Sequence, residues 1–192
     1  MVYELPDSAR GIVPWTRWSC CVFTPDIRKT AANAHNLGGR MLHPPVELGV
    51  DTVIAPIRDR LGGQMSLWQS EALPRAGHLQ TVGAWSHAAL ITPAVKTARS
   101  FYGELFNWEF SHHAGYEEIK HGGPLTASIR PNRTNYASEW ILTFKLSGLA
   151  VVTSILRNED RHLRPGVITI GPGSVVLTDP QGASFRVISV GQ

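Results

Sequence analysis

The sequence predicts an α+β fold built from three copies of one strand–helix–three-strand (βαβββ) unit. Short runs of alternating apolar residues, separated by turns, are typical of strands, and the 192 residues include 18 glycines and 13 prolines. Helical periodicity appears only between the first and second strand of each unit. Landmarks also recur at a nearly fixed spacing: Trp18 and Trp140 are 122 residues apart, and the turns that begin at Asp59 and Asp179 are 120 apart. Such a long-range period indicates duplicated units.

The first copy begins with a strand-like run over residues 18–24. Asp26 is a suitable helix N-cap, and Ile27, Ala31 and Ala34 then fall on one face of a predicted helix. The helix is expected to end at Gly38, because glycine suits a left-handed cap. Three further strands are predicted at residues 40–48, 51–58 and 65–69.

The middle copy has the clearest helix pattern. A strand is predicted over 86–92, and Pro93 then suits a first helical turn, where its missing N–H costs little. The helix carries a continuous apolar stripe, formed by Val95, Ala98, Phe101, Tyr102, Leu105 and Phe106. Strands are expected near 108–112, 117–121 and 125–130.

The last copy repeats this order. A strand is predicted over 140–146 and a helix over 150–157, followed by strands at 166–170, 174–178 and 184–190. The predicted organisation is therefore a tail (1–13), a single unit (14–70), a polar linker (71–83) and a domain of two units (84–192).

Composition narrows the range of partners. The net charge is only +3 and the basic residues are scattered, so we expect no nucleic-acid partner. The sequence has neither an apolar stretch of membrane-spanning length nor a secretory signal, which predicts a cytoplasmic protein without a membrane partner. Cys20 and Cys21 are adjacent on a predicted strand, so they face opposite sides and are not expected to form a disulfide.

Two motifs resemble the vicinal oxygen chelate superfamily, which includes glyoxalase I, extradiol dioxygenases and bleomycin-binding proteins. Residues 98–108 (ARSFYGELFNW) are similar to the family's helix signature, and residues 179–185 (DPQGASF) are similar to its closing hairpin. Leu37-Gly38-Gly39 with Pro44-Pro45 is similar to the middle of the same units. Among subgroups, the chain most resembles the two-domain proteins labelled putative hydroxylases or glyoxalase-like proteins, with one of the four units missing.

The resemblance implies that two units pack so that curved mixed sheets surround a cavity for a small organic molecule. Residues 84–192 supply such a pair, whereas the unit at 14–70 lacks its partner. An apolar sheet face of that size is normally covered. We therefore expect a homodimer in which two first units meet.

The resemblance also permits a check for a metal site. Metal-using members place one ligand on the first and one on the last strand of each of two units. His87 matches the histidine position, but Ile141 and Ser19 occupy the equivalent places, and Arg186, Ser66 and Ser128 occupy the closing-strand positions. Arginine does not coordinate cations, and one ligand of four is too few. We therefore expect no bound divalent metal and no other cofactor.

His87 and Arg186 are the predicted catalytic residues. An arginine binds a carboxylate, phenolate or enolate, and a histidine near its usual pKa moves a proton at neutral pH. The expected function is a metal-independent enzyme acting on a keto or phenolic metabolite by proton transfer, cyclisation or dehydration. The alternatives are a non-catalytic protein that binds a drug or metabolite, and a structural adaptor whose cup is filled by its own side chains.

The predicted substrate-binding residues are mainly aromatic, because flat apolar walls suit a planar ligand. They are Trp85, Trp108, Tyr116, Trp140 and His112. His112 and His113 are adjacent, so only one of them faces the cavity. The alternatives are that most of the aromatics are core residues, that His87 only retains an ancestral position, and that Arg186 points to solvent.

Overall fold

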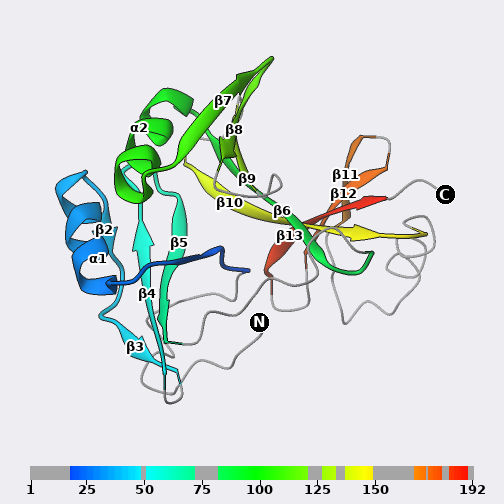
Figure 1. Cartoon of the computed structure of the whole chain (residues 1–192). Coiled ribbons are helices and arrows are strands. Elements are labelled where there is room, and N and C mark those ends of the chain that lie inside the picture. The colour runs from blue at the N-terminus through cyan, green and yellow to red at the C-terminus, as the bar shows by residue number, and fades with distance from the viewer. Residues whose placement is uncertain are drawn as a thin grey trace.

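The structure is a computed structural model that describes residues 18–48, 51–71, 82–120, 127–132, 137–148, 167–171, 173–178 and 182–189. Two curved sheets, each with parallel and antiparallel strand pairs, form the body of the chain (Figure 1). Two helices pack side by side on one side of it, and the hairpin of the last strands lies on the other (Figure 1). The predicted α+β class with curved mixed sheets is confirmed.

The first sheet has five strands and contains one copy of the predicted unit. Its strands pair in the order β1-β5-β4-β2, and β3 also pairs with β4. The elements are β1 (Cys21–Phe23), α1 (Ile27–Asn36), β2 (Arg40–Met41), β3 (Val46–Glu47), β4 (Thr52–Arg58) and β5 (Gln64–Ser70).

The second sheet has eight strands in the order β11-β12-β13-β10-β6-β9-β8-β7. Its central strands β6 and β10 are antiparallel, and each is flanked by the last strand of its own unit in parallel pairing. The two halves therefore repeat one strand order. The elements are β6 (Trp85–Thr92), α2 (Val95–Phe106), β7 (Glu109–His113), β8 (Tyr116–Lys120), β9 (Ala127–Pro131), β10 (Glu139–Leu146), β11 (Val167–Gly171), β12 (Ser174–Thr178) and β13 (Ser184–Ser189).

Most element boundaries agree with the sequence pattern. The Asp26 carboxylate accepts a hydrogen bond from the Lys29 backbone N–H at 2.9 Å, which caps α1 as predicted. Gly38 follows that helix with a φ of 85°, a conformation that favours glycine. Helix α2 begins at Val95, with Ala94 as its N-cap, two residues after the predicted start.

Two expectations differ from the structure or fall outside it. The strand predicted over 40–48 is divided into β2 and β3, because Pro44 and Pro45 lie between them and proline has no N–H for a sheet hydrogen bond. The helix predicted over 150–157 lies outside the described residues.

One continuous core joins the first sheet to α2 and to the eight-stranded sheet. The apolar stripe of α2 supplies Ala98, Phe101, Tyr102 and Leu105, all buried. The hydroxyl of Tyr102, whose side chain is 0% exposed, donates to Oδ2 of Asp59 at 2.7 Å and accepts from Nε1 of Trp140 at 3.0 Å. This Asp59–Tyr102–Trp140 chain connects a turn of the first sheet, the helix α2 and the central strand β10.

The Asp59 carboxylate is also bonded within its own turn. Its Oδ1 accepts from the backbone N–H groups of Leu61 and Gly63, both at 2.8 Å. A Cβ on Gly63 would lie 2.5 Å from Oδ2, so only glycine allows the turn to close around the carboxylate. The buried charge is thereby satisfied by several donors.

The face of the first sheet that points away from the α2 core is partly buried, although no second unit among the described residues packs against it as the resemblance would require. Ile54 and Ser66 on that face are buried, with exposed fractions of 6% and 5%. Phe23 and Met41 are exposed apolar side chains of the same sheet. The predicted homodimer stays a prediction.

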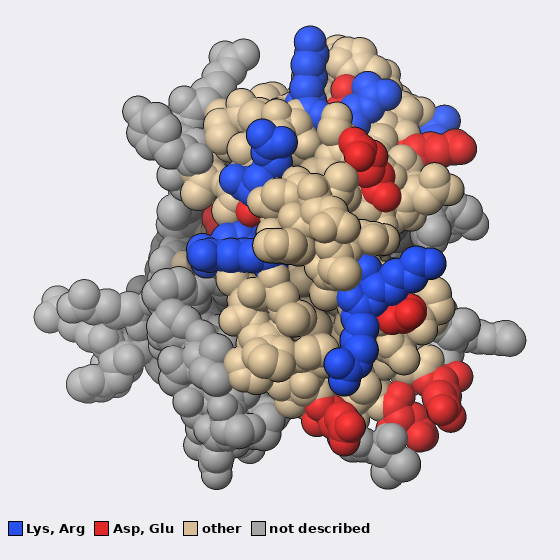
Figure 2. All heavy atoms as spheres, turned by 90° about the vertical axis from the view of Figure 1, so that its left-hand side faces the viewer, with Lys and Arg blue, Asp and Glu red and all other residues tan. Residues whose placement is uncertain are grey.

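The side that carries both helices has a mixed charge. Figure 2 shows Lys and Arg groups interspersed with Asp and Glu groups on this face. Within the described residues, no helix is long and apolar enough to cross a membrane.

We expect Tyr102→Phe to destabilise the protein by about 1–3 kcal/mol, because it leaves the buried Oδ2 of Asp59 without its donor. Urea unfolding measures the change. Tyr116→Phe deletes the same hydroxyl from a half-buried tyrosine on β8 and serves as the control. Equal losses for the two variants would contradict a special role for the Asp59–Tyr102–Trp140 chain.

Candidate functional site

The alternation of side chains along the strands defines two faces of the eight-stranded sheet. Ala88 and Leu90 of β6, and Ile129 of β9, belong to the core that includes α2. The alternate residues therefore lie on the opposite side, which we call the inner face. They include His87 on β6 and Arg130 on β9.

His87 and Arg186 lie in one row across the sheet. Thr143 on β10 is paired with His87 on one side and with Arg186 on the other. The structure thus brings both predicted catalytic residues to the inner face, on strands separated only by β10. The strand register alone places His87 and Arg186 on the same face.

Ser128 connects His87 to a second arginine. Its side chain is fully buried, and its Oγ lies 2.9 Å from Nε2 of His87, within hydrogen-bonding distance. The same Oγ accepts a hydrogen bond from Nε of Arg130 at 3.2 Å. The guanidinium of Arg130 lies over the ring of Tyr116, 4.5 Å from its centroid.

Arg186 is held in a similar way. Its Nε donates to Oγ of Ser174 on β12 at 2.8 Å. Partial burial and the nearby charge of Arg130 lower the pKa of Arg186. Two cationic groups therefore act on one another on the inner face.

This environment lowers the pKa of His87, so the imidazole is a weaker base than an ordinary histidine. Burial, the charge of Arg130 and the charge of Arg186 lower the pKa of His87 from 6.5 to about 4, while Glu118 opposes the shift. The imidazole is neutral at pH 7. The sequence predicts an ordinary histidine pKa, whereas burial in the first place, and then the charges of the two arginines, lower it.

Two of the predicted aromatic residues lie in the core. Trp108 and Trp140 both pack against Tyr102, with ring centroids 6.0 and 5.4 Å away. Trp85 shares the alternation of His87 and is half-buried, and its indole N–H has no hydrogen-bond partner among the described residues. Tyr116 lies under the guanidinium of Arg130 and so contacts the polar residues of the inner face.

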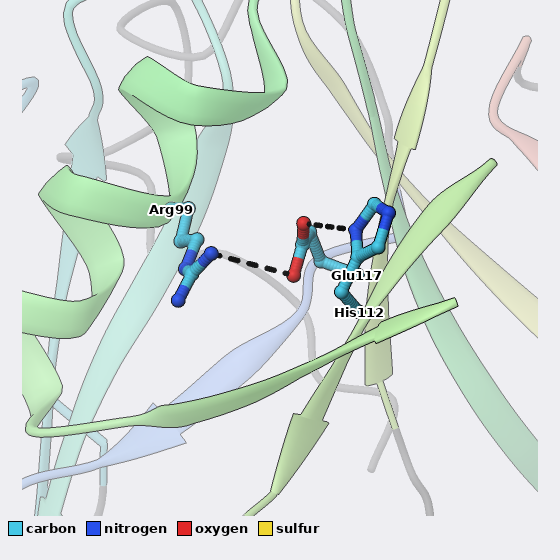
Figure 3. A network of polar contacts seen from close by, with 3 residues as sticks. All are labelled: Arg99, His112 and Glu117. Atoms are coloured by element: carbon cyan, nitrogen blue, oxygen red, sulfur yellow. Dashed lines mark hydrogen bonds and ion pairs between the residues drawn. The ribbon is translucent and has the colours of Figure 1, made fainter. Parts of the chain in front are cut away.

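His112 lies on the side of α2. Figure 3 shows Glu117 between Arg99 of α2 and His112 of β7. Nδ1 of His112 is 2.8 Å from the carboxylate, whereas the Arg99 nitrogen is 3.8 Å away, an ion pair too long for a hydrogen bond. The imidazole is 76% exposed. Its neighbour His113 bonds instead to Glu118 at 2.6 Å and stacks on Tyr116.

Sequence reasoning missed three residues that complete the inner face, which are Arg130, Ser174 and Glu118, and it did not decide which of His112 and His113 lies there. Each has the strand alternation that would have identified it. Glu118 is one residue from Glu117, for example, and their side chains lie on opposite faces. The signal was the register between strands, which a single sequence does not provide directly.

Two shallow pockets lie elsewhere, over the exposed side of α2. One is between α1 and α2 and is lined by Leu37, Arg60, Lys96, Thr97, Ser100, Phe101 and Glu104. The other reaches Trp108 and Phe110. Neither contains His87 or an inner-face arginine, so neither belongs to the group of polar residues described above.

The cysteines are free, as the strand pattern predicts. Burial raises the pKa of Cys20 to about 12, so it remains a thiol at neutral pH.

No family model matches the sequence, and no curated protein matches it. Solved structures do match. A variant of homoprotocatechuate 2,3-dioxygenase from B. fuscum, in complex with HPCA, has a TM-score of 0.54 at 16% identity, over 90% of this chain and 55% of that chain. The Mn(II)-bound glyoxalase from Novosphingobium aromaticivorans has a TM-score of 0.52 at 13% identity, over 88% of this chain and 61% of that one.

The chain thus shares the fold of this dioxygenase and this glyoxalase, and it spans 55% and 61% of their length. These identities show the fold alone. They do not single out the two-domain subgroup.

The expectation of no cofactor is corrected by this comparison. A glyoxalase of the same fold is Mn(II)-bound, so the fold itself accommodates a divalent metal. The described residues of this chain contain no group of three or more His, Cys, Asp or Glu side chains placed to hold an ion. The presence of Arg186 and Ser128 at positions where the family has metal ligands was therefore no ground for excluding a cofactor. Activity assays should accordingly be run both with and without added metal.

The low pKa of His87 predicts acid sensitivity of the fold. The unfolded chain binds a proton on this imidazole below pH 6.5 but the folded chain only below about 4, so stability is lost as pH falls through that window. The slope from this one group is at most about 1.4 kcal/mol per pH unit. Urea unfolding at pH 7, 6 and 5 measures it.

His87→Gln removes the titrating group and should flatten that slope. His112→Gln, on an exposed histidine, is the control and should keep it. An unchanged slope in His87→Gln would show that other groups cause the acid sensitivity.

Proposed function

We propose that the inner face of the eight-stranded sheet binds a small organic molecule, and that the chain is an enzyme that moves a proton on a keto or phenolic metabolite. The observation that supports this most is the convergence of His87, Arg130 and Arg186 on one face. A neutral imidazole accepts a proton, and guanidinium groups stabilise the negative oxygen that results.

For a ketone substrate the step is an enolisation. His87 takes a proton from the carbon next to the carbonyl, the C–H electron pair forms a C=C bond, and the carbonyl oxygen becomes an enolate beside a guanidinium. Return of the proton to another atom completes an isomerisation, and loss of hydroxide from the next carbon, as water, completes a dehydration. No electron acceptor is needed.

The second candidate is a protein that binds a metabolite or drug without altering it. The pKa of His87, about 4, favours this alternative, because a base so weak has little driving force to remove a proton at pH 7. Both functions use the same inner face.

The His87→Ala variant separates the two functions. The measurement is deuterium exchange from D₂O into phenylpyruvate and into the neutral ketone benzylacetone, followed by proton NMR, with chelator or with added Mn(II). We expect a loss of about 100-fold in the exchange rate if His87 is the base. Binding of either ketone should change much less.

His112→Ala is the matched control, because His112 is exposed and bonded to Glu117 on the opposite face. A variant of His87 with undiminished exchange would refute the catalytic role. Binding without exchange in the wild type would establish the binding protein.

The finer family assignment is also a proposal. We infer that the chain is related to the two-domain putative hydroxylase group, with a single unit at 14–70, a linker at 71–83 and a two-unit domain at 84–192. The supporting observation is that the five-stranded sheet repeats the order of each half of the eight-stranded sheet.

This arrangement predicts a homodimer formed through the first sheets. We expect a mass of about two chains by light scattering, and replacement of the exposed Phe23 by Asp should shift it toward one chain. Glu109→Lys, an exposed site on the other sheet, is the control. A single-chain mass at every micromolar concentration contradicts the prediction.

A further inference from the structure

We propose that the molecule bound at the inner face carries a carboxylate, which binds to the guanidinium groups of Arg130 and Arg186. This inference rests on the proposed function, because it assigns a charge to the ligand of that site. It goes further by naming the chemical group that the site recognises and the residues that recognise it.

The first argument is an excess of positive charge. Arg130 and Arg186 come from β9 and β13, which flank the central strands β6 and β10, yet their charges act on one another and on His87. Neither forms an ion pair with a carboxylate of the described residues. Glu118, the acidic group that acts on His87, is already bonded to His113 at 2.6 Å.

On the outer side of the same sheet, by contrast, an arginine has an acidic partner from the chain itself. Arg99 faces Glu117, and the carboxylate is shared with His112 (Figure 3). There the acidic partner belongs to the chain. On the inner face the two half-buried arginines lack such a partner within the described residues, and their like charges repel one another. An anionic ligand removes that repulsion.

The second argument is orientation. Each arginine uses its Nε to bond a serine: Arg130 bonds Ser128 at 3.2 Å and Arg186 bonds Ser174 at 2.8 Å. The ring of Tyr116 further fixes the plane of the Arg130 guanidinium. The terminal nitrogens of a guanidinium held in this way form the fork that binds a carboxylate through two parallel hydrogen bonds.

Apolar side chains next to the arginines favour an organic anion over an inorganic one. The half-buried Ile91 lies on the same side of β6 as His87, and the half-buried Ile188 follows Arg186 on β13. Tyr116 adds an aromatic face. A site with an apolar wall and a cationic end suits a molecule with an apolar body and one carboxylate.

The test compares benzoate with benzamide, which have nearly the same shape but differ in charge, on the full chain by titration calorimetry. We expect benzoate to bind at least about tenfold more tightly, since a charge-assisted pair with arginine contributes more than a neutral hydrogen bond. The benzoate affinity should also fall as salt is raised. Inorganic phosphate is tested in parallel to separate a general oxyanion site from one for organic acids.

Arg186→Gln and Arg130→Gln should each reduce the benzoate preference to about twofold or less, whereas the control Arg99→Gln should retain it. Arg99 is a good control because its charge is compensated by Glu117 on the opposite face. Amide chemical shifts locate the bound probe, and we expect the changes on β6, β9 and β13.

The outcomes separate this inference from the proposed function. Equal binding of benzoate and benzamide at β6, β9 and β13 would overturn the carboxylate assignment and leave the small-molecule site intact. Phosphate binding without benzoate binding would also overturn it. Shift changes confined to the pocket between α1 and α2, or no binding of any probe at about 10 mM, would count against both.

Discussion

The Asp59–Tyr102–Trp140 chain of hydrogen bonds is the constraint on which the relation between the two sheets depends. It joins a turn of the first sheet, the buried face of α2 and the central strand β10 through groups that have almost no contact with water. Burial and the adjacent Asp59 raise the pKa of Tyr102 well above its usual value, so the phenol remains a donor. A polar contact of this kind fixes one packing arrangement where apolar contacts alone would permit several.

That constraint also explains why the outer and inner faces of the eight-stranded sheet have different roles. The outer face packs against α2, where Trp108 and Trp140 contact Tyr102 in the core. Polar residues that the core does not need are collected on the inner face by strand alternation. The fold therefore separates the residues that hold it together from those available for chemistry.

The helices and most strands, and part of the candidate site, could be predicted from the sequence. Periodicity predicted α1 with its Asp26 cap, and the resemblance to the family's histidine position identified His87, which lies on the inner face. The sequence was not sufficient for Trp108, Trp140 and His112, because composition does not tell which face of a strand packs on a helix. The shift in the pKa of His87 was also inaccessible, since its largest cause is burial in the folded chain, and Arg130 is bonded to it only through Ser128, which is 41 residues from His87 in the sequence.

Ser128 has a consequence for the independence of the functional groups. A single buried hydroxyl is shared by Nε2 of His87 and Nε of Arg130, so the orientation of one side chain constrains that of the other. Effects of changes at these two positions should be non-additive, because a change at either one removes a partner of the shared hydroxyl and allows that hydroxyl to reorient relative to the other. During evolution, the effect of a substitution at the histidine or at the arginine would therefore depend on which residue occupies the other position.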